Sequence, residues 1–393
     1  MSEYRARIER LQMRLQAEDI DGFVVTQNVD LYYLTGSMQT GYLVVPASGE
    51  PRFFVRRSRA RAEVEAAAAV EALESFRSLG QQIAAAFPQL GPAAKVRLAA
   101  EYDVLPVQQF HRLQSLLPHA EWADGSLLIR ELRMIKTPYE IGRIREAAKL
   151  IDEALEDLLG RLQPGMTELE AMSGVEHFIR RRGHLGLMRV RGYNQEIITG
   201  MLGAGEAAAE PTYFDGPAGG RGLSPASPQS ASRRPIGPGE PILIDIGCCV
   251  DGYVIDQTRT AVIGKMAVDL ERAYGAAEEI LRRTEELLRP GTSCDKLYTE
   301  SLRWAKEAGL AEHYMGFGSD QVKFLGHGIG LEIDELPVLA RGFRYGLEPG
   351  MVLAVEPKFT FPGQGVVGIE NSYAITGEGF EKLTVSREGL LTL

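Results

Sequence analysis

Residues 241–260, PILIDIGCCVDGYVIDQTRT, decide the fold of the C-terminal half of the chain. An apolar run leads into Asp245, the turn-like pair Asp251 and Gly252 follows, and a second apolar run leads to Asp256. This pattern predicts two antiparallel strands joined by a tight turn, with the two aspartates facing each other. An isolated carboxylate out of water is very costly. No nearby lysine suits the role of its partner, so we predict that the partner is a bound cation.

Three later segments supply the other ligands that such a cation needs. His327 lies between glycines in GHGIGLEIDELP, Glu356 ends the apolar run of GMVLAVEPKF, and Glu370 lies in GVVGIENSYAIT. With Asp245 and Asp256 they make one imidazole and four carboxylates. Hard oxygen donors with a single nitrogen suit a pair of Mn²⁺, Co²⁺ or Fe²⁺ ions, and Zn²⁺ also fits. Because carboxylates can bridge, five ligands can serve two metals.

Each of these residues also has a purely structural interpretation. Asp245 could accept hydrogen bonds from backbone amides at a strand end, and Asp256 could cap a turn. Glu356 and Glu370 could form structural ion pairs, and a lone His327 would be as consistent with a core residue as with a ligand. The occurrence of all five together favours the metal site.

The order Asp, Asp, His, Glu, Glu, with eleven residues from Asp245 to Asp256, resembles the M24 metallopeptidases, which include proline dipeptidase, Xaa-Pro aminopeptidase and methionine aminopeptidase. LYYLTG at 31–36 and ELRMIKTPYEIGRIREAA at 131–148 resemble the two-domain creatinase and prolidase branch. The resemblance implies an N-terminal creatinase-like α/β domain, a C-terminal pita-bread domain with a dinuclear metal site, and a homodimer in which the N-terminal domain covers the neighbouring site.

The resemblance also implies a role for each ligand. Asp245 would chelate one metal, Asp256 and Glu370 would bridge both, and His327 with Glu356 would complete the second. Two divalent ions lower the pKa of a shared water from about 15.7 towards about 7. Glu356 would then carry a proton between that water and the leaving amine. We therefore expect hydrolysis of a peptide bond near a free N-terminus, beside proline, as in an aminopeptidase or dipeptidase.

Three positions depart from the resembled family. Its peptidases carry a second His seven residues after the metal His, where this chain has Asp334. They carry another before the first metal Asp, where residues 222–239 contain none, and Gly368 stands where an Arg is often found. An ionised Asp can only accept hydrogen bonds. We predict that Asp334 recognises a cationic group, such as an α-amino terminus, or acts as a base in a non-peptidase reaction; a surface acid is the structural alternative.

These departures keep two other functions open. One is a metal-dependent hydrolase or lyase that acts on a small non-peptide C–N or C–S compound. The other is a binding protein that retains the fold for partner recognition. Retention of all five ligands disfavours the binding protein, because a scaffold has no use for such buried charge.

The order of elements predicts an α/β protein of two domains, residues 1–127 and 128–393. The first alternates strands and helices, with a hairpin over GYLVVPASGEPRFFV, an Ala-rich helix within 57–80 and a strand at 95–101. The second begins at a capping box, Thr137 to Glu140, that opens a long helix.

Two pairs of matching segments predict a pseudo-twofold repeat in the second domain. LQPGMTELEAMSGVEHFIRRRG and LRPGTSCDKLYTESLRWAKEAG align without gaps, and each carries two glycines 18 residues apart. A Pro-Gly pair also precedes both Asp245 and Glu356 by the same six residues. Duplicated helix-plus-strand halves would bring one acidic pair from each half to a central seam.

Residues 200–239 are dense in Gly, Ala, Pro and Ser and predict a long loop. Such a loop is either a solvated connector or a functional segment. In the functional interpretation it forms a lid or a substrate loop, and Arg233 and Arg234 are the candidates to bind a substrate carboxylate.

The composition limits the possible partners and compartments. Among 393 residues, 45% are hydrophobic and 24% charged, as in ordinary globular proteins. The formal charge of −10 argues against a nucleic-acid partner. No apolar run is long enough for a membrane span, and the charged first helix lacks the apolar core of a signal peptide. Three cysteines without CxxC spacing predict no disulfide framework and favour the cytoplasm.

Overall fold

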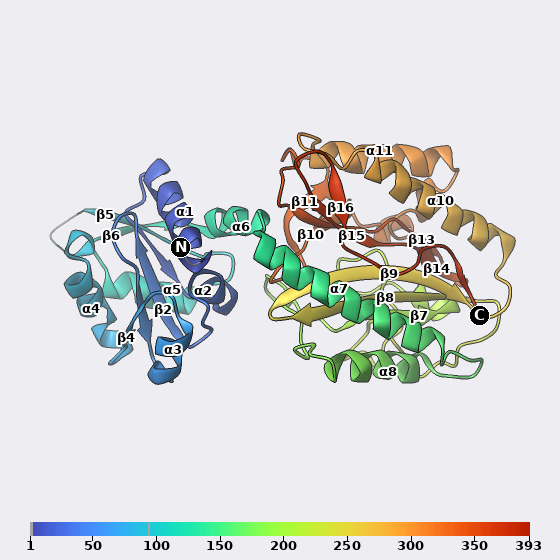
Figure 1. Ribbon diagram of the computed structural model, residues 1–393, viewed down its shortest axis with the longest axis horizontal. Helices are drawn as coiled ribbons and strands as arrows, with labels where there is room; N and C mark the ends of the chain where they lie inside the picture. The colour runs from blue at the N-terminus through green and yellow to red at the C-terminus, as the bar shows by residue number, and fades with distance from the viewer. Residues whose placement is uncertain (1–2, 93–94) are drawn as a thin grey trace. The chain divides into compact units, whose positions relative to one another are not determined.

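The computed structural model describes residues 3–92 and 95–393, and the chain folds into two units (Figure 1). The first unit extends to Arg133 and includes residues 192–194, and the second contains residues 134–191 and 195–393. The predicted boundary at Leu127 falls within helix α6 (Ser126–Met134), and the first unit ends where this helix ends. Within the described residues, no helix combines the length and apolar character of a membrane span.

The first unit is built on one mixed sheet with the strand order β4-β3-β2-β1-β5-β6. Its strands are β1 (Gly22–Val25), β2 (Gly41–Pro46), β3 (Arg52–Val55), β4 (Ala69–Ala72), β5 (Val96–Ala100) and β6 (Ala120–Asp124). Its other helices are α1 (Glu3–Ala17), α2 (Asn28–Thr35), α3 (Arg59–Glu65), α4 (Leu79–Ala86) and α5 (Val107–Leu116). The β2–β3 hairpin and strand β5 confirm two of the predicted elements.

The prediction of a single Ala-rich helix within residues 57–80 is wrong. Helix α3 ends at Glu65, and Ala69–Ala72 form β4, which pairs in parallel with β3 from Arg52 onwards. Alanine has the highest helix propensity, but propensity is a weak preference of less than about 1 kcal/mol per residue. The unsatisfied backbone groups at the edge of β3 select an extended partner instead.

A buried acid at the end of β5 makes the first unit sensitive to pH. Glu101 is fully buried and accepts hydrogen bonds from the backbone N–H groups of Thr26 and Gln27 at 3.0 and 3.2 Å. Burial, reinforced by the charge of Asp30, raises the pKa of Glu101 from 4.5 to about 7. The folded unit therefore holds a proton that the unfolded chain releases.

We expect the stability of the first unit to fall as the pH rises from about 4.5 to about 7, because there the unfolded chain binds fewer protons. The total loss should be on the order of 1–3 kcal/mol, and Glu101→Gln should flatten this dependence. Urea unfolding can be followed through Trp122 in a Trp304→Phe background, since the chain has 2 tryptophans. An unchanged pH slope in the variant would contradict the assignment.

The second unit contains two larger sheets and a short hairpin. One sheet has the order β17-β9-β8-β7, the other the order β11-β10-β12-β15-β16, and β13 pairs with β14. The first sheet contains β7 (Gly200–Ala204), β8 (Pro241–Val250), β9 (Tyr253–Val262) and β17 (Leu391–Thr392). The second contains β10 (Phe324–Gly328), β11 (Glu335–Ala340), β12 (Val352–Val355), β15 (Asn371–Ile375) and β16 (Phe380–Lys382), and the hairpin β13 (Lys358–Phe361) and β14 (Gly365–Gly368).

Two pairs of helices pack on the strands of the second unit (Figure 1). Helices α7 (Pro138–Leu159) and α8 (Glu168–Arg180) lie against β7, β8 and β9, and the short α9 (Gly205–Ala208) follows β7. Helices α10 (Val268–Glu285) and α11 (Cys294–Glu307) lie against β10, β11, β13 and β14. The mixed α/β architecture and the pseudo-twofold arrangement agree with the predicted fold.

The local geometry confirms the internal repeat. Helices α8 and α11 begin at N-caps Thr167 and Ser293, which occupy equivalent positions of the two aligned segments. Two residues before each cap, Gly165 and Gly291 adopt left-handed φ angles of 88° and 85°, which favour glycine. The predicted capping box at Thr137 is also present and opens α7.

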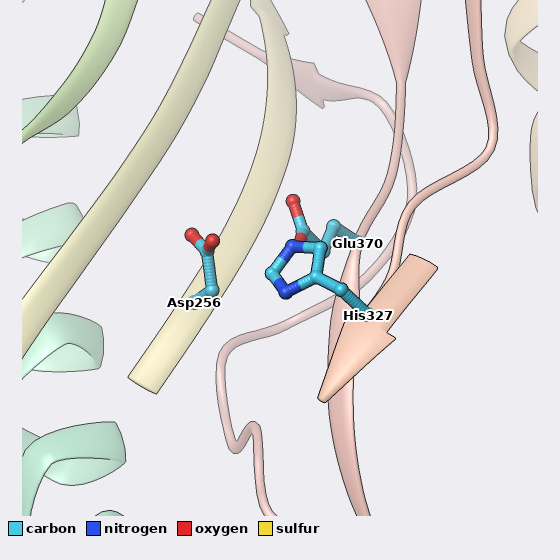
Figure 2. Close-up of side chains that lie close together, drawn as sticks. All are labelled: Asp256, His327 and Glu370. Carbon is cyan, nitrogen blue, oxygen red and sulfur yellow. The ribbon is translucent and has the colours of Figure 1, made fainter. Parts of the chain in front are cut away.

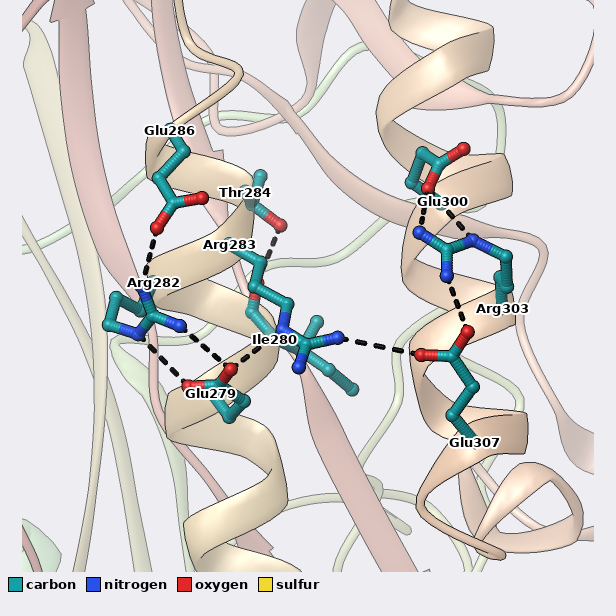
Figure 3. Close-up of polar contacts among 9 residues, drawn as sticks. All are labelled: Glu279, Ile280, Arg282, Arg283, Thr284, Glu286, Glu300, Arg303 and Glu307. Atoms are coloured by element: carbon teal, nitrogen blue, oxygen red, sulfur yellow. Dashed lines mark hydrogen bonds and ion pairs between the residues drawn. The ribbon is translucent and has the colours of Figure 1, made fainter.

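Helices α10 and α11 lie side by side and carry a network of ion pairs on their outer faces (Figure 3). Arg283 contacts Glu279 at 2.6 Å and Glu307 of the other helix at 3.5 Å. Arg303 lies between Glu300 and Glu307. Exposed pairs of this kind contribute only about 0.2–1 kcal/mol each. The apolar core beneath these helices therefore provides most of their attachment.

Candidate metal centre

The β8–β9 ladder places the two aspartates on one face of the sheet. Asp245 pairs with Thr258, and Asp256 pairs with Gly247. The aspartates are therefore diagonal neighbours two positions apart in register rather than directly opposed, and residues two apart on a strand share a face. The predicted antiparallel strand pair is confirmed, with this offset between its acids.

The other three residues come from the second large sheet and its connections. His327 is in β10 beside Ala354 of β12, Glu356 follows β12, and Glu370 precedes β15. An isolated bridge between Thr258 and Glu370 joins the two sheets, with Glu370 N–H donating to the Thr258 carbonyl at 3.1 Å. The two halves of the second unit therefore meet at this bridge, and we call this contact the seam.

The structure brings all five predicted ligands together. They form two groups that share Glu370: Asp256, His327 and Glu370 (Figure 2), and Asp245, Glu356 and Glu370. In each group, one potential ligand atom per residue lies within 4.8 Å of the others. Two adjoining groups of oxygen and nitrogen donors are the arrangement expected of a centre for divalent cations.

A lysine occupies the second of these groups, which corrects the prediction that no lysine could partner the acids. The fully buried Nζ of Lys358 lies 3.2 Å from Asp245 Oδ2, 2.6 Å from Glu356 Oε2 and 3.0 Å from Glu370 Oε2. An ammonium group has three donors, and here each faces a carboxylate. Lys358 therefore neutralises part of the buried negative charge.

The crowding of acids perturbs their protonation. Burial raises the pKa of Asp245 to about 6 and that of Glu356 to about 7, although the Lys358 charge opposes both rises. Burial, together with Glu370 and Asp245, raises the pKa of Asp256 well above its usual value. Burial lowers the pKa of Lys358, but the three carboxylates outweigh it and raise the pKa well above normal. The lysine therefore remains charged.

The group formed by Asp256, His327 and Glu370 fits a divalent ion. Among the described residues, the buried Oε1 of Glu370 has no hydrogen-bond partner, whereas its Oε2 accepts from Thr258 and Lys358. His327 Nδ1 lies 3.1 Å from the Gly328 carbonyl oxygen, which favours a proton on Nδ1 and leaves Nε2 as the ligand. The group around Lys358 does not fit a second ion in this arrangement, since the ammonium fills it.

Asp334 lies beside the centre. Its Oδ1 is 3.4 Å from His327 Nδ1, and 47% of its side chain remains exposed. Burial lowers the pKa of His327, but Asp334 and Glu356 outweigh burial and the pKa is raised. The adjacent Glu335 is fixed by Lys136 at 2.9 Å and by the Leu331 N–H at 2.8 Å. This buried anchor positions the loop that presents Asp334.

A cavity opens onto the ligands, and residues of the segment 200–239 form one wall of it. The prediction of one long loop over this segment is wrong for its first part, because Gly200–Ala204 form β7 beside β8 and Gly205–Ala208 form α9. The cavity is lined by Asp245, Asp256, His327, Glu356 and Asp334, and by residues 214–219 and 229–230. Apolar side chains on its walls are Met188, Ile197, Ile198, Met201, Phe214, Phe324 and Ile333. The part of the segment at 214–219 and 229–230 therefore lies beside the predicted ligands. Within the described part of the chain, the cavity lining contains no arginine and no lysine.

The two arginines predicted to bind substrate lie elsewhere. Arg234 forms a bidentate pair with Glu240 at 2.7 and 2.6 Å, and Arg233 is exposed. Neither lines the cavity. The prediction rested on their place in the segment 200–239, read as a substrate loop, whereas the structure gives Arg234 a carboxylate partner in Glu240. The structure gives no support to a substrate-binding role for either residue.

Lys358 is the functional candidate that sequence reasoning missed. It follows Glu356 by two residues in an extended segment, so both side chains point to the same face. That spacing was the available signal. Three acids in different segments had to be placed before the lysine could be recognised as their common partner.

Comparison with known proteins agrees with this geometry. Residues 142–377 match metallopeptidase family M24, and residues 7–135 match the creatinase/prolidase N-terminal domain. An Xaa-Pro dipeptidase of Pyrococcus furiosus is 25% identical over 389 residues, which cover 98% of this chain and 100% of that protein.

Solved structures show the same two-part architecture. The Xaa-Pro dipeptidase from Bacillus anthracis superimposes with a TM-score of 0.84 and 26% identity, covering 99% of this chain and 100% of that one. Dipeptidase PepE from Mycobacterium ulcerans gives 0.82 and 25%, covering 99% and 98%. The chain therefore belongs to metallopeptidase family M24, in its prolidase branch. Members of this family are metal-dependent hydrolases, so the protein is an enzyme of that class.

Proposed function

We propose that the protein hydrolyses the peptide bond after the N-terminal residue of short Xaa-Pro peptides and depends on divalent metal. The observation that carries this proposal is the group formed by Asp256, His327 and Glu370, which adjoins a cavity lined by Glu356. The names of the relatives, Xaa-Pro dipeptidase and dipeptidase, support the substrate class.

Asp256, His327 and Glu370 would hold the metal. A divalent ion bound there polarises a carbonyl oxygen and makes water more acidic. Glu356 adds a proton carrier: with a pKa raised by burial to about 7, it can take up and release a proton near neutral pH. The neighbouring Lys358 fixes the carboxylate of Glu356 through the 2.6 Å contact at Oε2. The apolar cavity wall provides a surface for the proline ring.

The charge of the cavity indicates which end of the substrate is recognised. Asp334 and Asp215 line it, and the described lining residues include no arginine or lysine to receive a carboxylate. An ionised carboxylate accepts hydrogen bonds and attracts an ammonium group. We therefore propose that Asp334 binds the free α-amino group of the substrate.

Blocking the two ends of a substrate should have opposite consequences. Amidation of the C-terminus should leave turnover of an Xaa-Pro dipeptide unchanged or higher, and N-acetylation should abolish it. Asp334→Asn should raise KM about tenfold or more, since a hydrogen bond to a charged group contributes about 1.5–3 kcal/mol. Steady-state assays of the free, amidated and acetylated forms measure this. Equal cleavage of the acetylated peptide would contradict the role of Asp334.

The proposal is tested by release of the N-terminal residue from Xaa-Pro and non-proline peptides of increasing length. We expect metal-dependent turnover that requires proline in the second position. Folded, metal-loaded protein that cleaves none of these peptides would remove the peptidase assignment. The cavity, with its apolar walls and acidic groups, would then favour a small cationic non-peptide substrate for a hydrolase or lyase.

We propose Mn²⁺ as the native metal, because most of the ligands are hard carboxylate oxygens. A homodimer is proposed from the family resemblance. A cytoplasmic location is proposed from the cysteines, which are free and buried at Cys248, Cys249 and Cys294. Metal analysis of the purified protein, its mass in solution and cell fractionation test these three points separately.

A further inference from the structure

The buried lysine at the centre has a consequence for the number of metal ions. We infer that the Lys358 ammonium takes the place of one of two metal ions, so that the protein holds a single divalent ion between Asp256, His327 and Glu370. This inference rests on the proposal that the centre binds metal, and it concerns how many ions it binds.

The position of Nζ supports this inference directly. It lies within 2.6 to 3.2 Å of all three carboxylates of the Asp245, Glu356 and Glu370 group. An ion bound by the same three carboxylates would require the space that Nζ fills. Because two cations repel each other strongly at such short range, the ammonium and a second ion exclude each other.

The backbone around Lys358 is shaped to admit its side chain. Lys358 is the first residue of β13 and pairs with Gly368 of β14. A Cβ atom at position 368 would lie 2.5 Å from Lys358 Cγ and 2.8 Å from the Pro357 carbonyl oxygen. The glycine therefore leaves room for the lysine stem. A residue larger than glycine at position 368 would therefore clash with the side chain of Lys358 in the position it occupies.

The two oxygens of Glu370 divide the centre into a lysine side and a metal side. Oε2 accepts hydrogen bonds from Lys358 Nζ at 3.0 Å and from Thr258 Oγ1 at 2.7 Å. Oε1 is buried and has no hydrogen-bond partner among the described residues. A buried acceptor without a partner is costly. An ion between Oε1, Asp256 and His327 would satisfy it while Lys358 stays in place.

Metal content measures the inference without an activity assay. Chelator-treated protein would be dialysed against increasing Mn²⁺, and bound ions counted by elemental analysis and native mass spectrometry. We expect wild-type protein to saturate at one ion per chain and Lys358→Ala to saturate at two. Lys323→Ala, which removes an exposed lysine preceding β10, should remain at one. Saturation of the wild type at two ions would overturn the inference, even if Lys358→Ala does not fold.

A second variant tests whether the single ion lies in the group of Asp256, His327 and Glu370. His327→Ala removes a ligand from the group that we assign to the single ion. We expect it to bind no ion, because Lys358 still fills the neighbouring group. If His327→Ala bound one ion as tightly as the wild type does, His327 would not be a ligand of the single ion, and the inference would be overturned.

The outcomes also separate this inference from the proposed function. One ion per chain without cleavage of any Xaa-Pro peptide would leave the inference standing and contradict the proposed peptidase function. Two ions per chain with cleavage would overturn the inference and leave the proposed peptidase function standing. A wild-type protein that binds no ion would overturn both.

Discussion

Glu356→Gln is expected to lower kcat for Xaa-Pro substrates by about 10²–10⁴-fold, the usual contribution of a general acid–base. Glutamine keeps the shape of the side chain and an oxygen that can accept the Lys358 hydrogen bond. It cannot carry a proton between the attacking water and the leaving amine. The measurement is steady-state hydrolysis of an Xaa-Pro dipeptide, with bound metal determined in the same samples.

A matched variant isolates the role of Glu356 from general effects of charge removal. Glu348→Gln neutralises an exposed glutamate in the turn before β12 and should leave kcat and KM unchanged. Circular dichroism of both variants should match the wild type. If Glu356→Gln retains full turnover with the same metal content, Glu356 is not the proton carrier.

Lys358→Ala is expected to destabilise the chelator-treated protein at pH 8 by about 3–5 kcal/mol, the usual cost of breaking a buried ion pair. At that pH Glu356, with a pKa of about 7, is mostly ionised. Removing the ammonium therefore leaves three buried carboxylates without their counter-charge. Urea unfolding followed through Trp304, in a Trp122→Phe background, reports on this unit.

Two comparisons make the Lys358→Ala result specific. Lys323→Ala should change the unfolding free energy by less than about 0.5 kcal/mol, as exposed substitutions usually do. Mn²⁺ should restore much of the stability of Lys358→Ala, because an ion that binds only the folded state stabilises it. A Lys358→Ala protein as stable as the wild type in chelator would show that the lysine does not compensate the acids.

The elements predicted well from the sequence were those with a strong local signal. Apolar runs around Asp251 and Gly252 predicted the β8–β9 pair. The matched glycines predicted the internal repeat, which the equivalent N-caps of α8 and α11 support. The five candidate ligands came from acids within or at the end of apolar runs and from a histidine between glycines, because buried charge needs a partner. The structure brings them together because the repeat places the two sheets along one seam.

The elements that could not be predicted depend on partners distant in the sequence. Strand β4 forms because β3 offers an edge, which the Ala-rich sequence does not reveal. Lys358 meets Asp245 across 113 positions, and only the fold places its Nζ between three acids. The pair of Arg234 with Glu240 was also missed, although the two residues are only 6 positions apart, because either residue could equally have faced the solvent or a substrate.

The central claim is a metal-dependent Xaa-Pro peptidase with one metal ion and one built-in ammonium group. The most direct test is a titration of chelator-treated wild-type protein with Mn²⁺, in which bound metal and Xaa-Pro turnover are measured in the same samples. We predict that turnover rises in proportion to bound metal and reaches its plateau at one ion per chain. A plateau reached only at two ions per chain, or no turnover at any metal content, would contradict the account.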